Sequence, residues 1–212
     1  MDMVRRVVTT LEKKCEIIEV PFMQHNSKIR DAKNEVMDTL MSRECTEPCC
    51  TIGKRVFQQH RNVAVFGIHW RPGDTIMKEM GPHLRQLLEL VNTTFGAHFN
   101  IVCVSLFKHG KHRRGEITSD EYMSDPVAGT VCISIGQVRN LMIRRTKGSV
   151  KSKATRKSIS FKTKNAWAVQ MKGKNFHKWY SHEYPEERKV MGSRVMFSFR
   201  NAEYTEEDMG VV

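Results

Sequence analysis

The sequence predicts an α+β protein, with an N-terminal helical region followed by many short strands that form a β-sandwich or jelly roll. Hydrophobic residues between positions 27 and 42 recur every three to four residues, which is typical of an amphipathic helix. From Gly53 onward, short apolar runs alternate with turn-forming residues, which is typical of strands. No repeat with a period of 20 to 50 residues is visible in the chain, so a solenoid or propeller is not expected.

Two helices can be placed on the sequence. The first covers Ser27–Ser42, with its apolar positions at Ile29, Ala32, Val36, Met37 and Leu40. The second covers Pro82–Asn92, where Leu84, Leu87, Leu88 and Val91 form one stripe. Gly96 follows as a helix stop.

The expected strands are short, and several are apolar throughout, as strands buried on both faces are. They cover residues 62–67, 99–107, 131–136, 140–143, 158–162, 166–171 and 193–200.

At 212 residues the chain can bury one sizeable core. We expect a helical and loop extension over residues 1–52, a jelly-roll domain over 53–204 and an acidic tail over 205–212. Six cysteines are unevenly spread, and Cys103 and Cys132 lie inside apolar strands, which indicates thiols in a reducing, intracellular compartment. Cys45, Cys49 and Cys50 could bind a metal, but no second cluster completes a set of four ligands, so a loop with free thiols is favoured.

The charge gives the first indication of function. Lys and Arg number 35 against 23 Asp and Glu, a net charge of +12. A basic domain attracts polyanions, and release of counterions from a phosphate backbone makes nucleic acid the favoured partner. RNA is weakly favoured over DNA, although the charge itself does not distinguish the two. An anionic membrane is the alternative, but the sequence lacks both a long apolar span and a basic amphipathic helix with an aromatic face.

The segment from Ile143 to Lys164 is the most basic part of the chain. It contains nine basic residues and no acid. A solvated hairpin loop and an arm that tracks phosphates are compatible interpretations, and the uncompensated charge favours the arm. Its candidate contacts with nucleic acid are Arg144, Arg145, Lys147, Lys151, Lys153, Arg156 and Lys157.

The C-terminal strand contains two arginines on one face. Alternation over residues 194–200 places Arg194 and Arg200 with Met196 and Ser198, opposite an apolar face. Buried guanidinium groups need an anion, which is either a bound carboxylate or a salt bridge to Glu183, Glu186 or Glu187. His182 lies twelve residues before Arg194. Taken alone, a single histidine of this kind is more often a core residue than a metal ligand.

Together, several ordered segments between Val56 and Arg200 resemble the AlkB family of iron(II)/2-oxoglutarate dioxygenases, which remove alkyl groups from nucleic-acid bases. The matching segments are VAVFG, PHLRQLLELVN, FNIVCVSLFKHG, DEYMSDPVAGTVCISIGQVR, NAWAVQMKGKNFHKWYSHEYP and SRVMFSFR. The resemblance implies a double-stranded β-helix that uses Fe(II) and 2-oxoglutarate. It also implies that His182 is the distal iron ligand, that Arg194 holds the far carboxylate of 2-oxoglutarate with Arg200 nearer the metal, and that Asp120 and Glu121 lie near the substrate base.

The sequence departs from this family at the iron motif. The family takes two ligands from a His-x-Asp, whose outer residues share one face of a strand. Ungapped alignment places Ile117 and Ser119 there, and a slip of one residue gives Thr118 and Asp120, which recovers a carboxylate as a metal ligand but no histidine. Ser105 and Phe107 replace the Asn and Tyr that contact the co-substrate. His109, His112 and His177 are expected to be solvated or to contact phosphate rather than bind the metal.

Three hypotheses follow. The chain is an AlkB-type dioxygenase of alkylated RNA or DNA that uses Asp120 and His182 with an unusual third ligand. Alternatively, it is a pseudoenzyme that retains the fold as a nucleic-acid-binding module, or an accessory domain that binds acidic proteins. Domains of this family also occur in replicase polyproteins of plant RNA viruses, and the N-terminal fifty residues would fit a fragment of such a chain.

Overall fold

The computed structural model describes residues 5–11, 14–42, 45, 49–52, 55–58, 61–67, 77–117, 125–146, 158–173 and 176–201. Its elements in chain order are β1 (Arg6–Leu11), β2 (Cys15–Pro21), η2 (Met23–His25), α1 (Asn26–Met41), β3 (Cys49–Ile52), β4 (Arg55–Gln58), β5 (Asn62–Gly67), β6 (Met77–Lys78), α3 (Pro82–Phe95), β7 (Ile101–Phe107), β8 (Arg114–Ile117), β9 (Thr130–Gly136), β10 (Arg139–Arg145), β11 (Ser158–Thr163), β12 (Trp167–Lys172), α4 (Phe176–Trp179), β13 (Tyr180–Tyr184) and β14 (Arg194–Arg200).

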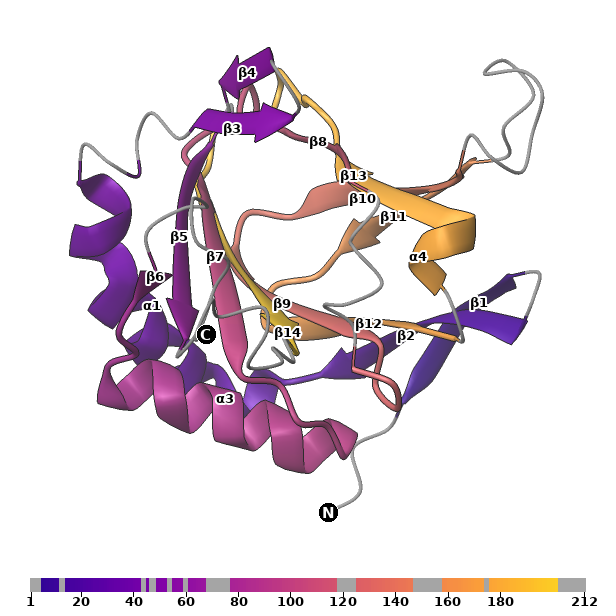
Figure 1. The fold of residues 1–212 in the computed structure, drawn as a ribbon, viewed down its shortest axis with the longest axis horizontal. Coiled ribbons are helices and arrows are strands. Elements are labelled where there is room, and N and C mark those ends of the chain that lie inside the picture. The colour runs from indigo at the N-terminus through magenta and orange to yellow at the C-terminus, as the bar shows by residue number, and fades with distance from the viewer. Residues whose placement is uncertain are drawn as a thin grey trace, which may run out of the picture.

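Two sheets face each other across the centre of the molecule (Figure 1). The large sheet has the order β1-β2-β12-β9-β14-β7-β5-β6, and the small sheet has the order β11-β10-β13-β8. Consecutive strands from β7 to β14 are thus divided between the sheets, four to each, and all their pairings are antiparallel. This arrangement confirms the predicted jelly roll, or double-stranded β-helix, with few helices.

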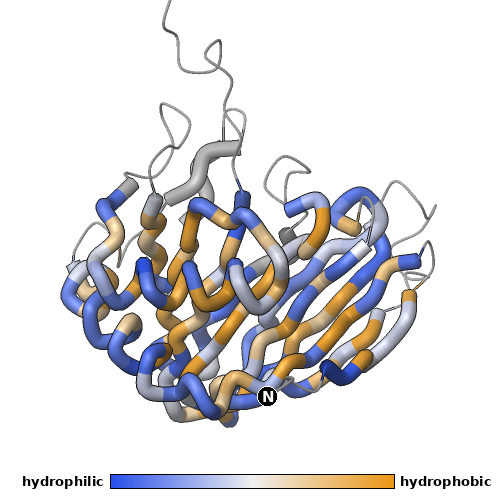
Figure 2. Tube along the Cα trace, turned by 90° about the horizontal axis from the view of Figure 1, so that it is seen from below, coloured by the Kyte–Doolittle hydropathy of each residue, from blue (hydrophilic) through white to orange (hydrophobic). Residues whose placement is uncertain are grey.

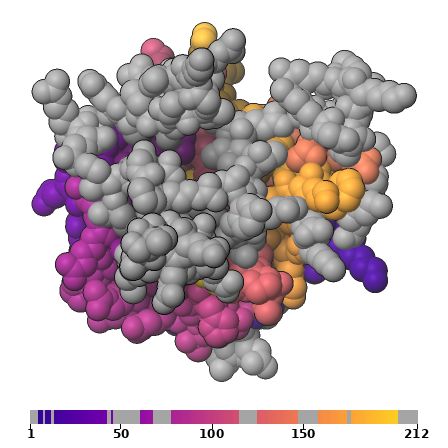
Figure 3. Space-filling view, in the orientation of Figure 1, coloured from indigo at the N-terminus to yellow at the C-terminus, as the bar shows by residue number. Residues whose placement is uncertain are grey.

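Helices α1 and α3 cover the outer face of the large sheet, and α3 forms the magenta surface at the lower left of Figure 3. The stripe predicted for α3 is buried against the sheet, where it meets the apolar face of β14, represented by Val195, Phe197 and Phe199. Gly96 ends α3 in the left-handed conformation, as expected, with φ of 61°. Figure 2 shows the hydrophobic stretches that run along the strands.

A second core lies between the two sheets. Large-sheet side chains such as Phe107 and Met196 pack there against small-sheet side chains such as Leu141, Ile143 and Tyr184. This inner core is the space in which the polar residues of the next section are buried.

The N-terminal stretch differs from the expected helical and loop extension. Strand β2 pairs with β12 from Glu16 to Pro21, and β1 pairs with β2, so both strands extend the large sheet. Cys15 and Ile17 of β2 are buried in the inner core. Their run is apolar enough for a strand, but its partner β12 lies 150 residues away, which sequence periodicity does not reveal. The predicted acidic tail lies outside the described residues.

Cys15, Cys45, Cys103 and Cys132 form no disulfide bond with one another, and Cys45 is buried in the outer core. The backbones of Cys49 and Cys50 belong to β3. Among the described residues, no helix is both long and apolar enough to span a membrane.

Candidate functional site

The inward face of β14 carries the two arginines that the sequence singled out. Met196 of this strand packs in the inner core, and Val195 packs in the outer core. Alternation therefore directs Arg194, Ser198 and Arg200 between the two sheets, as predicted. All three are buried.

Arg194 lies at the start of β14 and is 1% exposed. Its Nη1 donates to the backbone oxygen of Gln137 at 2.9 Å and to that of Thr163 at 3.4 Å, and its Nε has no hydrogen-bond partner among the described residues. Burial lowers the pKa of Arg194 to about 10, and the nearby Tyr184 hydroxyl opposes this shift. Neutral carbonyls do not neutralise a buried guanidinium, so this end of the interior can accept an anionic group.

The salt bridges considered as an alternative for this strand are formed by other arginines. Glu183 pairs with Arg144 at 2.7 Å, Glu187 with Arg139 at 3.3 Å and Glu186 with Arg188 at 2.7 Å. Glu183 and Glu187 thus pair with arginines of β10, and Glu186 pairs with an arginine of the loop before β14. None of these bridges involves Arg194.

His182 lies in the middle of β13 and is 1% exposed. Neither ring nitrogen has a hydrogen-bond partner among the described residues, and this is unusual for a buried histidine. Across the strand pair, the backbone of Ile117 in β8 lies directly opposite His182. The structure therefore brings together the two strand positions at which the resemblance expected iron ligands, with isoleucine at one of them.

Burial holds the pKa of His182 well below its ordinary value, and the positive charges of Arg114, His177, Arg200 and Arg61 lower it further. Arg114 belongs to β8, Arg200 to β14, and Arg61 immediately precedes β5. Guanidinium groups from both sheets thus approach the same imidazole.

Arg61 and Arg114 were not predicted from the sequence. The Nε of Arg61 donates to Oγ of Ser105 at 3.2 Å, and Nη1 of Arg114 donates to Oγ of Ser198 at 3.4 Å. Both arginines and both serines are buried. Arg114 stands three residues before Ile117, and a bulge in the β8–β13 pairing places it opposite Tyr184. A bulge has no sequence periodicity, so the inward direction of Arg114 could not be inferred.

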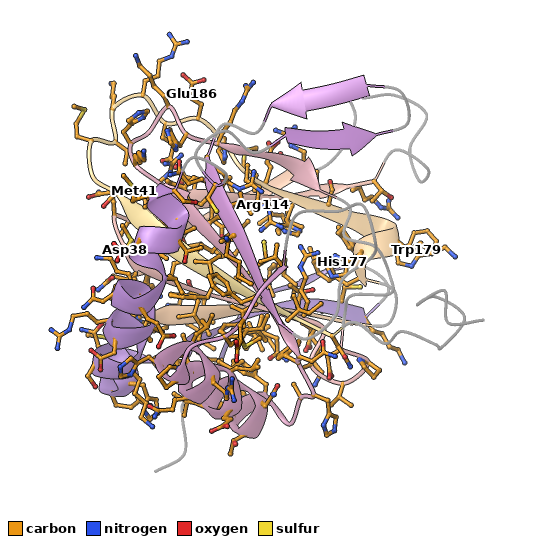
Figure 4. The ribbon with its side chains drawn as sticks, turned by 60° about the vertical axis from the view of Figure 1, so that its left-hand side comes forward. Asp38, Met41, Arg114, His177, Trp179 and Glu186 are labelled. Atoms are coloured by element: carbon orange, nitrogen blue, oxygen red, sulfur yellow. The ribbon has the colours of Figure 1, made fainter. Side chains whose placement is uncertain are left out.

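Figure 4 shows Arg114 and His177 in the interior of the molecule and Trp179 at its periphery. His177 corrects the expectation of a solvated residue, because it is 4% exposed and hydrogen-bonded to Oγ1 of Thr130 at 2.8 Å. Its ring centre lies 6.1 Å from that of His182. Burial lowers its pKa to about 3, with further contributions from Arg200 and Arg114.

Ser105 and Phe107, the expected co-substrate contacts, both lie inside the fold and are fully buried. Phe107 packs against Tyr184 with ring centres 5.7 Å apart, and Arg139 lies 5.2 Å from the Phe107 ring centre. Arg139 itself donates to the backbone oxygens of His109, His112 and Pro185, so it fixes the loops at this end of the interior.

His109 and His112 lie together in the turn after β7, with ring centres 4.4 Å apart. His109 is exposed, and His112 is partly buried.

Several predicted residues lie outside the described residues. They are Thr118, Ser119, Asp120, Glu121, Lys147, Lys151, Lys153, Arg156 and Lys157. Of the predicted nucleic-acid contacts, Arg144 and Arg145 are described at the end of β10, where Nε and Nη2 of Arg144 donate to Glu183 at 3.0 Å and 2.7 Å.

The described residues around His182 do not by themselves complete a set of ligands for iron(II), and positions 118–124, just after Ile117, lie outside the described residues. The described part of the chain contains no group of three or more histidine, cysteine, aspartate or glutamate side chains able to hold a metal. Fe(II) in oxygenases requires two histidines and a carboxylate. The positive charges of Arg114, Arg200 and Arg61 act on His182, and they would disfavour a cation bound to it.

No protein-family model and no curated protein matches the sequence. Solved structures do match the fold. The structure of OsALKBH1 superposes with a TM-score of 0.52 at 12% identity, covering 87% of this chain and 96% of that one. The non-heme alpha-ketoglutarate-dependent carbocyclase SnoK from nogalamycin biosynthesis superposes with a TM-score of 0.53 at 10% identity, covering 88% and 80%. The chain therefore has the fold of the AlkB-like and other 2-oxoglutarate-dependent oxygenases.

Proposed function

We propose that this chain is a nucleic-acid-binding module on an AlkB-type fold, and that it does not use iron at the centre of the fold. The observation that carries the proposal is the environment of His182. The backbone of this expected iron ligand lies opposite that of Ile117, and the positive charges of Arg61, Arg114 and Arg200 act on its imidazole. The described residues contain no group of three or more side chains able to hold a metal. An oxygen-activating iron(II) requires a facial triad of ligands, and these neighbours do not supply one.

The charge of the chain supports nucleic acid as the partner. The net charge is +12, and nine of the basic residues fall between positions 143 and 164 without an acid. This segment joins two adjacent strands of the small sheet, β10 and β11, so both of its ends are anchored. Such a segment can follow a phosphate backbone without specifying sequence.

A second function is favoured by Arg194. Its buried guanidinium contacts two backbone carbonyls but no carboxylate of the described residues, and this would suit a bound 2-oxoglutarate. With Asp120 as a further ligand beside His182, the chain would be a dioxygenase that removes methyl groups from N-alkylated bases in RNA or DNA. Fe(II) and 2-oxoglutarate would then be its cofactors.

An anaerobic titration with Fe(II) and 2-oxoglutarate separates these functions. The binding module should show no visible charge-transfer band and release no succinate from an N-methylated oligonucleotide. If the band forms and succinate is released in proportion to demethylated base, the second function is correct.

RNA binding is tested by its dependence on salt. The affinity for single-stranded RNA should fall steeply as salt rises, because phosphate contacts release counterions. Replacing Lys151, Lys153 and Lys157 by Gln should reduce the slope of log K against log[salt] by about 2 if each lysine contacts a phosphate. A matched variant with Lys28, Arg30 and Arg85 replaced removes three exposed charges from α1 and α3 and should keep the slope. Equal slopes for the two variants would remove the arm from the proposal.

A further inference from the structure

Two neighbouring loops at one end of the inner core carry a dense set of positive charges. The first loop, residues 108–113 between β7 and β8, consists of lysine, arginine and histidine apart from Gly110. The second loop, residues 185–193 before β14, adds Arg188 and Lys189. Figure 4 shows Glu186 of the second loop at the periphery of the molecule. Neither the residues around His182 nor the basic segment between β10 and β11 accounts for this charge.

The backbones of the two loops are bound directly to each other. Gly110 donates to the backbone oxygen of Val190 at 2.7 Å and accepts from the backbone nitrogen of Glu187 at 2.8 Å. The contact is so close that a Cβ on residue 110 would overlap the backbone oxygen of Glu187. Buried Arg139 donates to backbone oxygens of both loops. The two loops therefore form one surface whose shape is fixed before a ligand binds.

The acids of the two loops are already paired. The carboxylate of Glu187 binds Arg139 at 3.3 Å, and that of Glu186 binds Arg188 at 2.7 Å. Neither acid is therefore available to neutralise the remaining cations fully, and the surface has a net positive charge.

Three exposed cations of this surface lack an acidic partner among the described residues. Lys111, Arg113 and Lys189 form no salt bridge there. The pKa of Glu186 is lowered first by its hydrogen bond with Arg188. The charges of Arg113 and Lys111 lower it further, so cations of the first loop also act on the second. Like charges held together by the backbone repel one another, and a bound polyanion relieves this repulsion.

Groups able to contact a nucleic-acid base lie on the same two loops. His109 is exposed, and its ring centre lies 4.4 Å from that of His112. Met191 of the second loop is 83% exposed and offers apolar area. Unstacked bases pack on aromatic side chains, histidine included, and this favours single-stranded RNA over an acidic segment of a protein.

From these observations we propose that the basic surface formed by His109, Lys111, Arg113, Arg188 and Lys189 binds the phosphate backbone of single-stranded RNA, with His109 against a base. The surface lies at the start of β10, where Arg139 holds the loops, whereas the basic segment follows the end of that strand. The length of β10, about 20 Å, separates the two regions. The inference rests on the proposed function and adds a structured contact region to it.

The test is binding of a short, labelled single-stranded RNA to the full chain, measured by fluorescence anisotropy over a range of salt concentrations. Replacing Lys111, Arg113 and Lys189 by Gln should weaken binding about 10- to 100-fold at about 0.1 M salt and reduce the slope of log K against log[salt] by about 2, because three phosphate contacts are lost. The variant that removes three exposed charges from α1 and α3 is the matched control and should keep both values. The replaced side chains are exposed, so Tm should not change. Should the triple variant fail to fold, Lys111→Gln alone should reduce the slope by about 0.7.

The contact of His109 with a base has its own test. His109→Ala should weaken RNA binding about fivefold or more without changing the salt slope, because stacking on a base releases no counterions. His109→Phe keeps an aromatic ring and should bind with nearly the affinity of wild type. If His109→Ala binds as tightly as wild type, the assigned contact with a base is wrong.

The inference is overturned if the triple variant of this surface binds RNA with the affinity and salt slope of wild type. Salt-dependent binding of RNA by wild type would then leave the proposed function standing on the basic segment alone. If wild type does not bind RNA, the proposed function and this inference fail together. If poly-glutamate displaces the RNA at an equal concentration of charge, the surface takes acidic proteins, and RNA is the wrong partner.

Discussion

The buried imidazole of His177 should make the fold sensitive to mild acid. In the folded protein its pKa is lowered to about 3, whereas an unfolded chain protonates histidine near 6.5. Below pH 6.5 the unfolded state gains a proton that the folded state does not bind, so stability falls as pH decreases from about 6.5 towards 3. Above pH 6.5 both states are neutral at this residue, and its contribution to the pH dependence disappears.

The size of the effect follows from the difference between the two pKa values. At pH 5, which is about 1.5 units below the pKa of histidine in the unfolded chain, protonation of His177 stabilises the unfolded state by about 2 kcal/mol. For a chain of this length that corresponds to a decrease in Tm of roughly 4–8 °C. The pKa of His182 is lowered as well, so between pH 7 and pH 5 the free energy of unfolding of wild type should decrease by more than His177 alone accounts for.

The assay is chemical denaturation at pH 7 and pH 5 for wild type and His177→Gln, which can keep a hydrogen bond to Thr130. Between pH 7 and pH 5 the free energy of unfolding of the variant should decrease by about 2 kcal/mol less than that of wild type, whatever the stability of the variant at pH 7. His83→Gln, at an exposed position on α3, should behave like wild type. Equal losses in wild type and His177→Gln would refute the reasoning.

Four further predictions concern the start of α3, the outer core and the positions of the expected iron motif. Glu35→Ala should cost about 1 kcal/mol in thermal unfolding, because the Glu35 carboxylate accepts from the backbone nitrogens of His83 and Leu84 at the start of α3. Gly81→Ala should disturb the same cap, since an added Cβ would overlap the Glu35 carboxylate, and an unchanged Tm would contradict this packing. Phe197→Ala should lower the free energy of unfolding by about 3–5 kcal/mol, because its ring is fully buried between β14 and the helices; a loss below 1 kcal/mol would place it outside the core. Ile117→His with Ser119→Asp should bind Fe(II) only weakly in calorimetry, and adding Arg114→Met should strengthen binding by about tenfold or more, because it removes a charge next to the metal; equal affinities would show that Arg114 does not repel the ion.

Much of the fold could be predicted because its elements carry local patterns. Helix α3 follows from its apolar stripe and Gly96, and β5 matches the predicted run at residues 62–67. The inward face of β14 follows from the alternation of polar and apolar residues alone. By contrast, β13 escaped prediction because its residues, Tyr180–Tyr184, are buried at four of five positions without a regular alternation of polarity.

The site was predicted less completely, for a physical reason. Arg194 and His182 were found because the resemblance gave them roles. Arg61 and Arg114 were not, because their positions depend on a bulge and on contacts 44 and 84 residues away in the chain. His177 was misjudged because its burial depends on a hydrogen bond to Thr130, 47 residues earlier. Sequence periodicity indicates which face of a strand a residue occupies, but it does not indicate which charged side chains lie close together between the two sheets.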